Sequence, residues 1–273
     1  VSTSTTAGSL FGTTTWPVTY QMLELVSGTF SIFMLVIITF YAGELVWRER
    51  DSRQDQIQDA LPTPTWLPFA AKLVALMLLP VLLQAVLMLT GMAIQTGKGY
   101  HNYEIGLYAR DLFGVDLVNY WLICVLAMAV HTVVNQKYLG HFLMIVYFVV
   151  TSFAALLGFE HNLYLWGNNI GYTYSDMNGY GHFMARVRAF QGYYAAGAVL
   201  LVVLSYLLWV RGTTSDLRGR IAIAASRLTR PVAATAVAGL DSLLMVDAIL
   251  FVKVNEWENH RVPVVGAGES HAI

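Results

Sequence analysis

Carboxyl groups lie inside long apolar runs of the sequence, where an ionisable side chain needs an explanation. Glu44 falls near the end of the run at about residues 23–47, and Asp241 and Asp247 fall within the run at about residues 231–252. An ionisable group at membrane depth is costly unless it reaches the interface, pairs with another group or faces a polar cavity. Glu44 is close enough to its run's end to reach the interface or pair with a nearby arginine. All three are candidate intramembrane polar sites; for the two aspartates the alternatives are packing in a bundle interior or a last run that does not span.

A stretch of mixed charge carries a second kind of chemistry, that of a protein-docking surface. Residues 48–64 read RERDSRQDQIQDALPTP, which alternates both signs and closes with two prolines. A basic helix would indicate binding to anionic lipid, whereas alternating signs favour contact with another protein. Ile57, Ala60 and Leu61 fall on one face of a helix through this stretch. The alternative is a solvated loop helix without a partner.

Motifs of common enzymes are absent from the sequence. It has no HExxH motif, and its seven histidines lack the sequence spacing of metal ligands. The segment from Gly91 to Gly99 is a near-miss for a phosphate loop, because its glycine spacing is one residue too long and Gly99 replaces the required Ser or Thr. Cys124, the single cysteine, lies in an apolar run and is expected to pack as a small hydrophobe. We therefore expect no catalytic residues, metal or cofactor in this chain.

Composition and the placement of charge indicate a membrane protein. Of 273 residues, 56% are hydrophobic and 12% are charged, whereas soluble domains carry about 25% charged residues. The net charge of −1 gives no indication of binding to nucleic acid. Apolar runs alternate with polar segments, as a bilayer requires, and about 20 residues suffice to cross its hydrocarbon core. Six such runs cover about residues 23–47, 67–96, 117–134, 142–159, 193–210 and 231–252.

These runs predict an all-α fold, a polytopic transmembrane bundle of about six spans over residues 23–252 of a cell inner (plasma) membrane protein. More lysine and arginine follow the first, third and fifth runs than the others, which assigns those loops to the cytoplasm. The polar lead-in at 1–22, a loop at about 160–190 and the polar tail at 253–273 are then extracytoplasmic. The lead-in lacks the basic region of a signal peptide, and we expect a piece of a longer chain or one subunit of a complex.

Two local features refine the expected spans. Pro80 lies inside the second run, where proline in a membrane helix indicates a kink rather than a break. Residues 100–115 form a short amphipathic segment that we expect to lie flat at the membrane interface. Its apolar side chains on one side are Ile105, Leu107, Tyr108 and Leu112.

The stretch GELVWRERDSRQDQIQDALPTPTWLPFAAKLVAL resembles the coupling region of exporter-type ABC transporter permeases. In that superfamily an acidic-basic cluster follows a span, and a short coupling helix, a proline turn and a lysine at the start of the next span come after it. Glu49, Arg50, Pro62 and Lys72 match those places. The family's coupling helix inserts into a groove of the ATPase subunit.

Two further segments resemble the permease portion of bacterial permease/zinc-aminopeptidase fusion proteins. They are YSDMNGYGH at residues 174–182 and YLLWVRGTTSDLRGR at residues 206–220. In those proteins a stretch similar to residues 250–258 leads from the last span to the extracytoplasmic peptidase. The resemblance extends over about residues 41–258. The peptidase and its zinc motif are absent from the sequence, and only a polar lead-in stands where the family has its first membrane helix, so no peptidase activity is assigned.

The resemblance implies the membrane-spanning permease subunit of an ATP-driven ABC transporter, without enzyme activity of its own. Its partners would be an ABC ATPase subunit that holds ATP and Mg²⁺, a second permease half or a second copy in a homodimer, and membrane lipid. The coupling helix is expected at about residues 48–61. The ATPase-coupling residues would be Glu49, Arg50, Ile57 and Leu61.

Two other functions stay open. The branch resemblance is also compatible with a membrane anchor or scaffold for an extracytoplasmic enzyme such as a zinc aminopeptidase, without transport. An intramembrane enzyme that uses Asp241 and Asp247 is the third hypothesis. For a transporter, a path lined by apolar and aromatic side chains suits lipid, peptide or hydrophobic small molecules.

Overall fold

The computed structural model consists of helices, with one small strand pair before them. It describes residues 9–10, 13–14, 16–154, 156, 165–167, 172, 174, 177, 179–181, 183–210 and 217–259. The strands β1 (Ser9–Leu10) and β2 (Thr13–Thr14) pair antiparallel, with Ser9 opposite Thr14. The helices carry the rest of the described chain, which confirms the all-α class.

Five helices are long and apolar enough to cross a membrane. They are α2 (Thr19–Asp51), α4 (Trp66–Gly97), the continuous helix Ile105–Val134, α8 (Phe183–Leu207) and the Arg230–Ala248 part of α10 (Arg230–Asn259). The fourth predicted run forms a shorter helix instead, α7 (Lys137–Ser152), of 16 residues. Sixteen residues rise roughly 24 Å, less than the hydrocarbon thickness of about 30 Å. The described helices therefore give five candidate spans rather than six.

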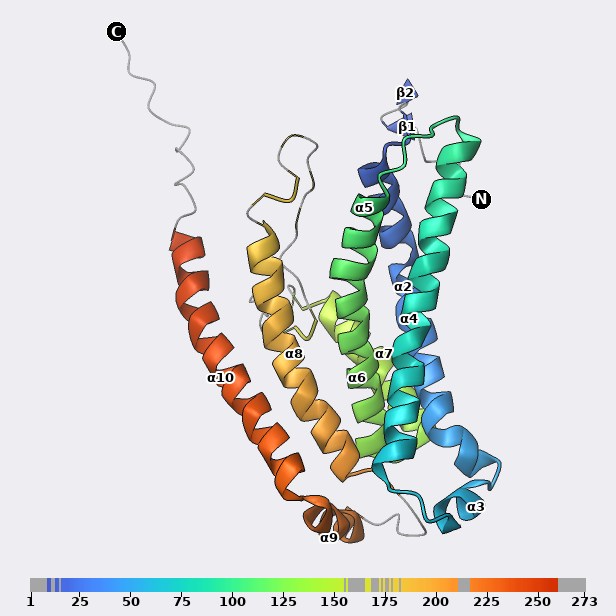
Figure 1. Cartoon of the computed structure of the whole chain (residues 1–273), viewed down its shortest axis with the longest axis vertical. Helices are drawn as coiled ribbons and strands as arrows, with labels where there is room; N and C mark the ends of the chain where they lie inside the picture. Colours follow the sequence, from blue (N-terminus) through green and yellow to red (C-terminus); the bar gives the residue numbers. More distant parts are fainter. Residues whose placement is uncertain are drawn as a thin grey trace.

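The helices alternate in direction along the bundle. Figure 1 shows α2 descending to the short helix α3 (Asp55–Ala60), α4 ascending, α6 descending, α7 ascending part of the way, and α8 descending to α9 (Leu217–Arg227) before α10 ascends. The end that holds α3 and α9 also holds the loops that the positive-inside rule assigned to the cytoplasm. We call it the α3–α9 end. The loops after the first, third and fifth predicted runs therefore lie at the same end, as predicted, although one helix is short.

The segment expected to lie flat at the interface is instead part of a span. α5 (Ile105–Tyr108), the π-helix η1 (Ala109–Asp116) and α6 (Leu117–Val134) follow one another without a break. Leu107, Tyr108 and Leu112 are buried against α2 and α4, while Ile105 is exposed. The apolar side of this segment thus faces the bundle, and the prediction of a surface helix was wrong.

α6 lies at the centre of the bundle and contacts α2, α4, α7 and α8, whereas α10 packs along α8. The core around α6 contains fully buried Ile38, Leu76 and Cys124. The Cys124 thiol points at the Leu76 carbonyl, with 3.6 Å between sulfur and oxygen, which agrees with its expected packing role. α4 continues through Pro80 without a break, and the kink expected there stays a prediction.

Candidate functional site

A polar cavity of about 340 Å³ lies in the half of the bundle away from the α3–α9 end. It opens between the start of α2, the π-helix η1 and the tyrosines Tyr172, Tyr174 and Tyr180. Its lining consists mainly of carboxyl groups and tyrosines, and no lysine or arginine is among the described residues that line it. The lining residues in the described part of the chain are Tyr20, Leu23, Glu24, Ser27, Leu107, Asp111, Asp116, Tyr172, Tyr174 and Tyr180.

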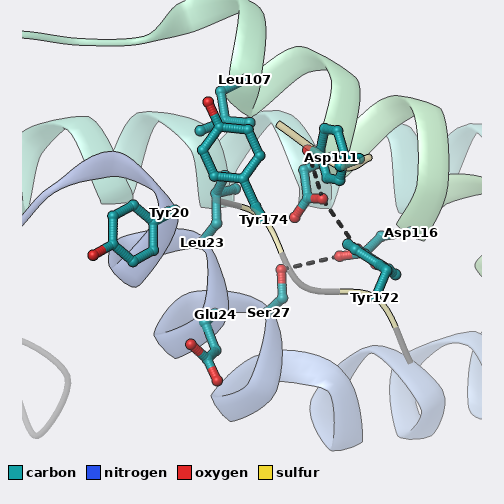
Figure 2. A pocket seen from close by; sticks show the side chains of 10 residues that line it. Tyr20, Leu23, Glu24, Ser27, Leu107, Asp111, Asp116, Tyr172 and Tyr174 are labelled. Atoms are coloured by element: carbon teal, nitrogen blue, oxygen red, sulfur yellow. Dashed lines mark hydrogen bonds between the residues drawn. The ribbon is translucent and has the colours of Figure 1, made fainter. Parts of the chain in front are cut away.

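Asp111 and Asp116 are the centre of this cavity, and each accepts hydrogen bonds from other segments (Figure 2). Tyr172 and Tyr180 both donate from their hydroxyls to Asp111 Oδ1 at 3.0 Å. Ser27 Oγ donates to Asp116 Oδ2 at 3.0 Å, which joins α2 to η1. The two carboxylates therefore hold together three parts of the chain that are far apart in sequence.

The π-helix explains why both carboxylates reach one cavity. They are five residues apart, and an α-helix would direct them about 140° away from each other. In a π-helix the hydrogen bonds run from i to i+5, so residues five apart come close to one face. Short π segments occur frequently at functional sites. Sequence reasoning based on the α-helical period missed this pair, and the two aspartates five apart were the only signal for it.

The two tyrosines stay protonated as donors. Burial raises the pKa of Tyr180 above its ordinary value, and the Asp111 carboxylate raises it further. Burial likewise raises the pKa of Tyr172, with added effects from Asp116 and Asp111. Among the described residues, no lysine or arginine lines the cavity beside these carboxyl groups and neutral phenols. The chemistry of the cavity suits a cationic or hydrogen-bond-donating group.

Tyr180→Phe is expected to lower the free energy of unfolding by about 2 kcal/mol, because it removes a hydrogen bond to a largely buried carboxylate and keeps the ring. Thermal unfolding in detergent measures the change. Tyr20→Phe is the matched control, since Tyr20 lines the same cavity and has no hydroxyl hydrogen bond among the described residues. Equal effects of the two substitutions would show that the bond to Asp111 contributes nothing.

A second polar cluster lies at the α3–α9 end and contains the predicted coupling residues Glu49 and Arg50. Glu49 forms an ion pair with Lys72, with 2.6 Å between Glu49 Oε2 and Lys72 Nζ. This pair joins α2 to α4. Arg50 donates to Asn135 Oδ1 at 2.8 Å and to the Val210 carbonyl at 3.2 Å. Both side chains line a cavity of about 300 Å³ that α3 borders.

The other two predicted coupling residues, Ile57 and Leu61, are largely exposed. Ile57 is 71% exposed on α3, and Leu61, directly after α3, is 51% exposed and also lines this cavity. The expected helix over residues 48–61 is divided: α2 continues through Asp51, and α3 contains only six residues. The structure thus brings Glu49 and Arg50 together as anchors and leaves the apolar pair on the surface.

The candidate intramembrane carboxylates are not brought together. Glu44 forms an ion pair with Lys137 Nζ at 2.7 Å, and Lys137 also pairs with Asp51 at 2.9 Å, so the partner of Glu44 is a lysine of α7 and not the expected arginine. Asp241 and Asp247 are exposed on α10, and neither forms an ion pair within the described part of the chain.

The spans of this bundle indicate a multi-pass membrane protein. It has a polar cluster at the α3–α9 end and an acidic cavity toward the other end. Comparisons with protein-family models, with curated proteins and with solved structures found no match to the chain.

Proposed function

We propose that the chain is the permease subunit of an ATP-driven transporter and that it docks a separate ATPase through α3. The observation that carries this proposal is the exposed apolar pair Ile57 and Leu61, next to a buried ionic anchor at the membrane end of the same segment. An apolar pair in this position suits insertion into a groove of a partner protein. The resemblance of residues 43–76 to the coupling region of exporter-type permeases supports the same role.

The anchor connects the end of α2, which leads into α3, to several other parts of the bundle. The Glu49–Lys72 pair joins the two helices on either side of α3. Arg50 reaches Asn135 in the turn between α6 and α7, and the Val210 carbonyl just after α8. The Arg50 guanidinium also lies 5.0 Å from the Trp47 ring centroid. A force on α3 would therefore reach α2, α4, the α6–α7 turn and the end of α8.

The mechanism that follows is mechanical. ATP-driven closure of the ATPase pair would push α3, and the spans attached to it would move as rigid bodies to open a path alternately to each side. A second permease half or a second copy of this chain would complete the path. This chain would supply the path and the coupling, while ATP and Mg²⁺ would be held by the ATPase.

The experiment that tests the proposal is co-purification from detergent-solubilised membranes, with mass spectrometry of the partners. We expect a stoichiometric ATPase that bears phosphate-loop motifs. The double variant Ile57→Asp/Leu61→Asp should lose it, because two carboxylates would have to enter an apolar groove. The matched control is Ile221→Asp/Leu228→Asp, which changes the exposed apolar pair on and after α9 at the same end of the bundle.

Two results would contradict the proposal. One is the absence of any ATPase in preparations of the unaltered chain. The other is equal retention of the ATPase by both double variants. Either result would favour the alternative, a membrane anchor for an extracytoplasmic enzyme without transport.

A further inference from the structure

A pair of histidines lies in the hairpin between α6 and α7. The ring centroids of His131 on α6 and His141 on α7 are 4.8 Å apart, with their planes inclined by 74°. His131 is completely buried. Both of its ring nitrogens, and Nδ1 of His141, are buried without a hydrogen-bond partner. The Thr39 main chain faces the His131 ring but forms no hydrogen bond of normal geometry with it.

Buried ring nitrogens without partners are costly, about 1–3 kcal/mol for each group, so their presence in a bundle core points to a ligand. The chain also makes room for the two rings. A Cβ atom on Gly43 would lie 2.2 Å from His141 Cε1, and one on Gly140 would lie 2.3 Å from His131 Nδ1. Glycine at these two positions permits the close approach of the rings. The pair is therefore a built feature of the α2–α6–α7 packing.

Two methionines extend the pair along the same hairpin. Met128 is three residues before His131, and Met144 is three residues after His141, so each lies one turn from its histidine on the same helix face. Figure 1 shows α6 and α7 running in opposite directions. By their order in the sequence, Met128 and Met144 are therefore both further from the α6–α7 turn than the histidines. They are 1% and 0% exposed and belong to one apolar cluster.

This set of side chains suits a soft metal and excludes a hard one. Imidazole nitrogen and thioether sulfur are ligands that select Cu(I), whereas carboxylate and carbonyl oxygens suit Mg²⁺, Ca²⁺ or Mn²⁺. Among the described residues there is no group of three or more His, Cys, Asp or Glu side chains that could hold a metal, so a typical zinc site lacks its ligands.

The charged groups that face the pair have both signs. Lys137 acts on both rings and Glu44 acts on His141, while Glu44 and Asp51 both pair with Lys137. Arg220 approaches from α9, but its guanidinium donates to the Thr132 and Val133 carbonyls at the end of α6. The aromatic neighbour is Phe40, 5.0 Å from the His141 ring. We propose that His131, His141, Met128 and Met144 bind one Cu(I) ion in the core of the hairpin.

The test is a Cu(I) titration of the full-length purified protein in detergent under reducing conditions, in competition with a chromogenic Cu(I) chelator. Ag(I) serves as a probe that does not change oxidation state. We expect one ion for each chain. Met128→Leu/Met144→Leu, which nearly conserves volume, should weaken binding about tenfold or more, and the X-ray absorption spectrum of the unaltered protein should contain nitrogen and sulfur scatterers.

The controls separate this site from general metal adsorption. Met22→Leu changes a methionine that is 1% exposed in a different cluster, and His101→Gln changes an exposed histidine; both should bind copper normally. The proposal would be overturned if the chelator kept all the copper, if the methionine pair made no difference, or if Zn²⁺ bound as tightly as Cu(I). Because these tests use the unaltered chain and leucine variants, they do not depend on the folding of a histidine variant.

Discussion

Lys72→Met is expected to lower the free energy of unfolding by about 3 kcal/mol, because it leaves the Glu49 carboxylate without the ammonium group that lies 2.6 Å away. Breaking a buried ion pair by removing one member costs about 3–5 kcal/mol. The lower end applies here, since the Glu49 side chain is 30% exposed while that of Lys72 is 10% exposed. Lys72 Nζ also lies 5.2 Å from the Trp209 ring centroid, and that contact is lost as well.

A double-mutant cycle isolates the pair. Glu49→Gln/Lys72→Met should recover part of the loss, because the charge left behind by the single variant is removed. Lys98→Met is the matched control: Lys98 lies just after the other end of the same helix, and it is exposed. Thermal unfolding in detergent measures the unaltered protein, Lys72→Met, Glu49→Gln, the double variant and Lys98→Met. If Lys72→Met cost no more than Lys98→Met, the pair would not be an anchor for the segment that carries α3.

The long spans could be predicted from the sequence because lipid leaves few alternatives. A chain in hydrocarbon must satisfy its backbone hydrogen bonds within helices, and runs of apolar residues therefore become helices with bounds near those of the runs. Three runs differ more in their bounds. The helices of the runs at about residues 117–134 and 193–210 begin well before them, at Ile105 and Phe183. The helix of the run at about residues 142–159 begins at Lys137 and ends at Ser152, because hydropathy does not indicate where a helix ends when the following residues are still apolar.

The error at residues 100–115 has a physical cause. The segment has polar residues on one side, such as Arg110 and Asp111, which is typical of an interfacial helix. Asp111 is nevertheless buried, because Tyr172 and Tyr180 supply hydroxyl donors from a segment more than 60 residues away. A sequence pattern within one helix cannot indicate a donor that comes from another part of the chain. The same limit hid the histidine pair, whose members lie on two helices.

The surface features of residues 48–64 are local and could be read from one stretch. It holds a charge cluster, an apolar pair and two prolines within 17 residues; Glu49 pairs with Lys72, and Ile57 and Leu61 are exposed, whereas their role in docking stays a prediction. The far partners of this stretch were not predictable. Arg50 contacts Asn135 and Val210, which are 85 and 160 residues away.

Arg220→Met is expected to lower the free energy of unfolding by about 4 kcal/mol, because one buried guanidinium satisfies main-chain carbonyls at the ends of two spans. It donates to the Thr132 and Val133 carbonyls at the end of α6 and to the Leu208 carbonyl just after α8, at 2.8 Å for the last. The final four carbonyls of a helix lack partners within it, and a cation there also interacts favourably with the helix dipole. Each hydrogen bond to a charged group contributes roughly 1.5–3 kcal/mol, and water at the membrane surface replaces part of the loss.

The charge of Arg220 persists in this position. Burial lowers the pKa of Arg220, and the nearby Arg50 guanidinium lowers it further, but an arginine stays protonated in proteins. Arg220→Lys should therefore keep the charge and still lose most of the stabilisation, because an ammonium group cannot reproduce the planar fork that reaches three carbonyls. Arg218→Met, an exposed change two residues earlier on α9, is the control. Hydrogen exchange should rise in α9 and at the ends of α6 and α8 in both Arg220 variants. If exchange stayed as slow there as in Arg218→Met, α9 would be held by its apolar contacts instead, and the ends of the spans would not depend on this residue.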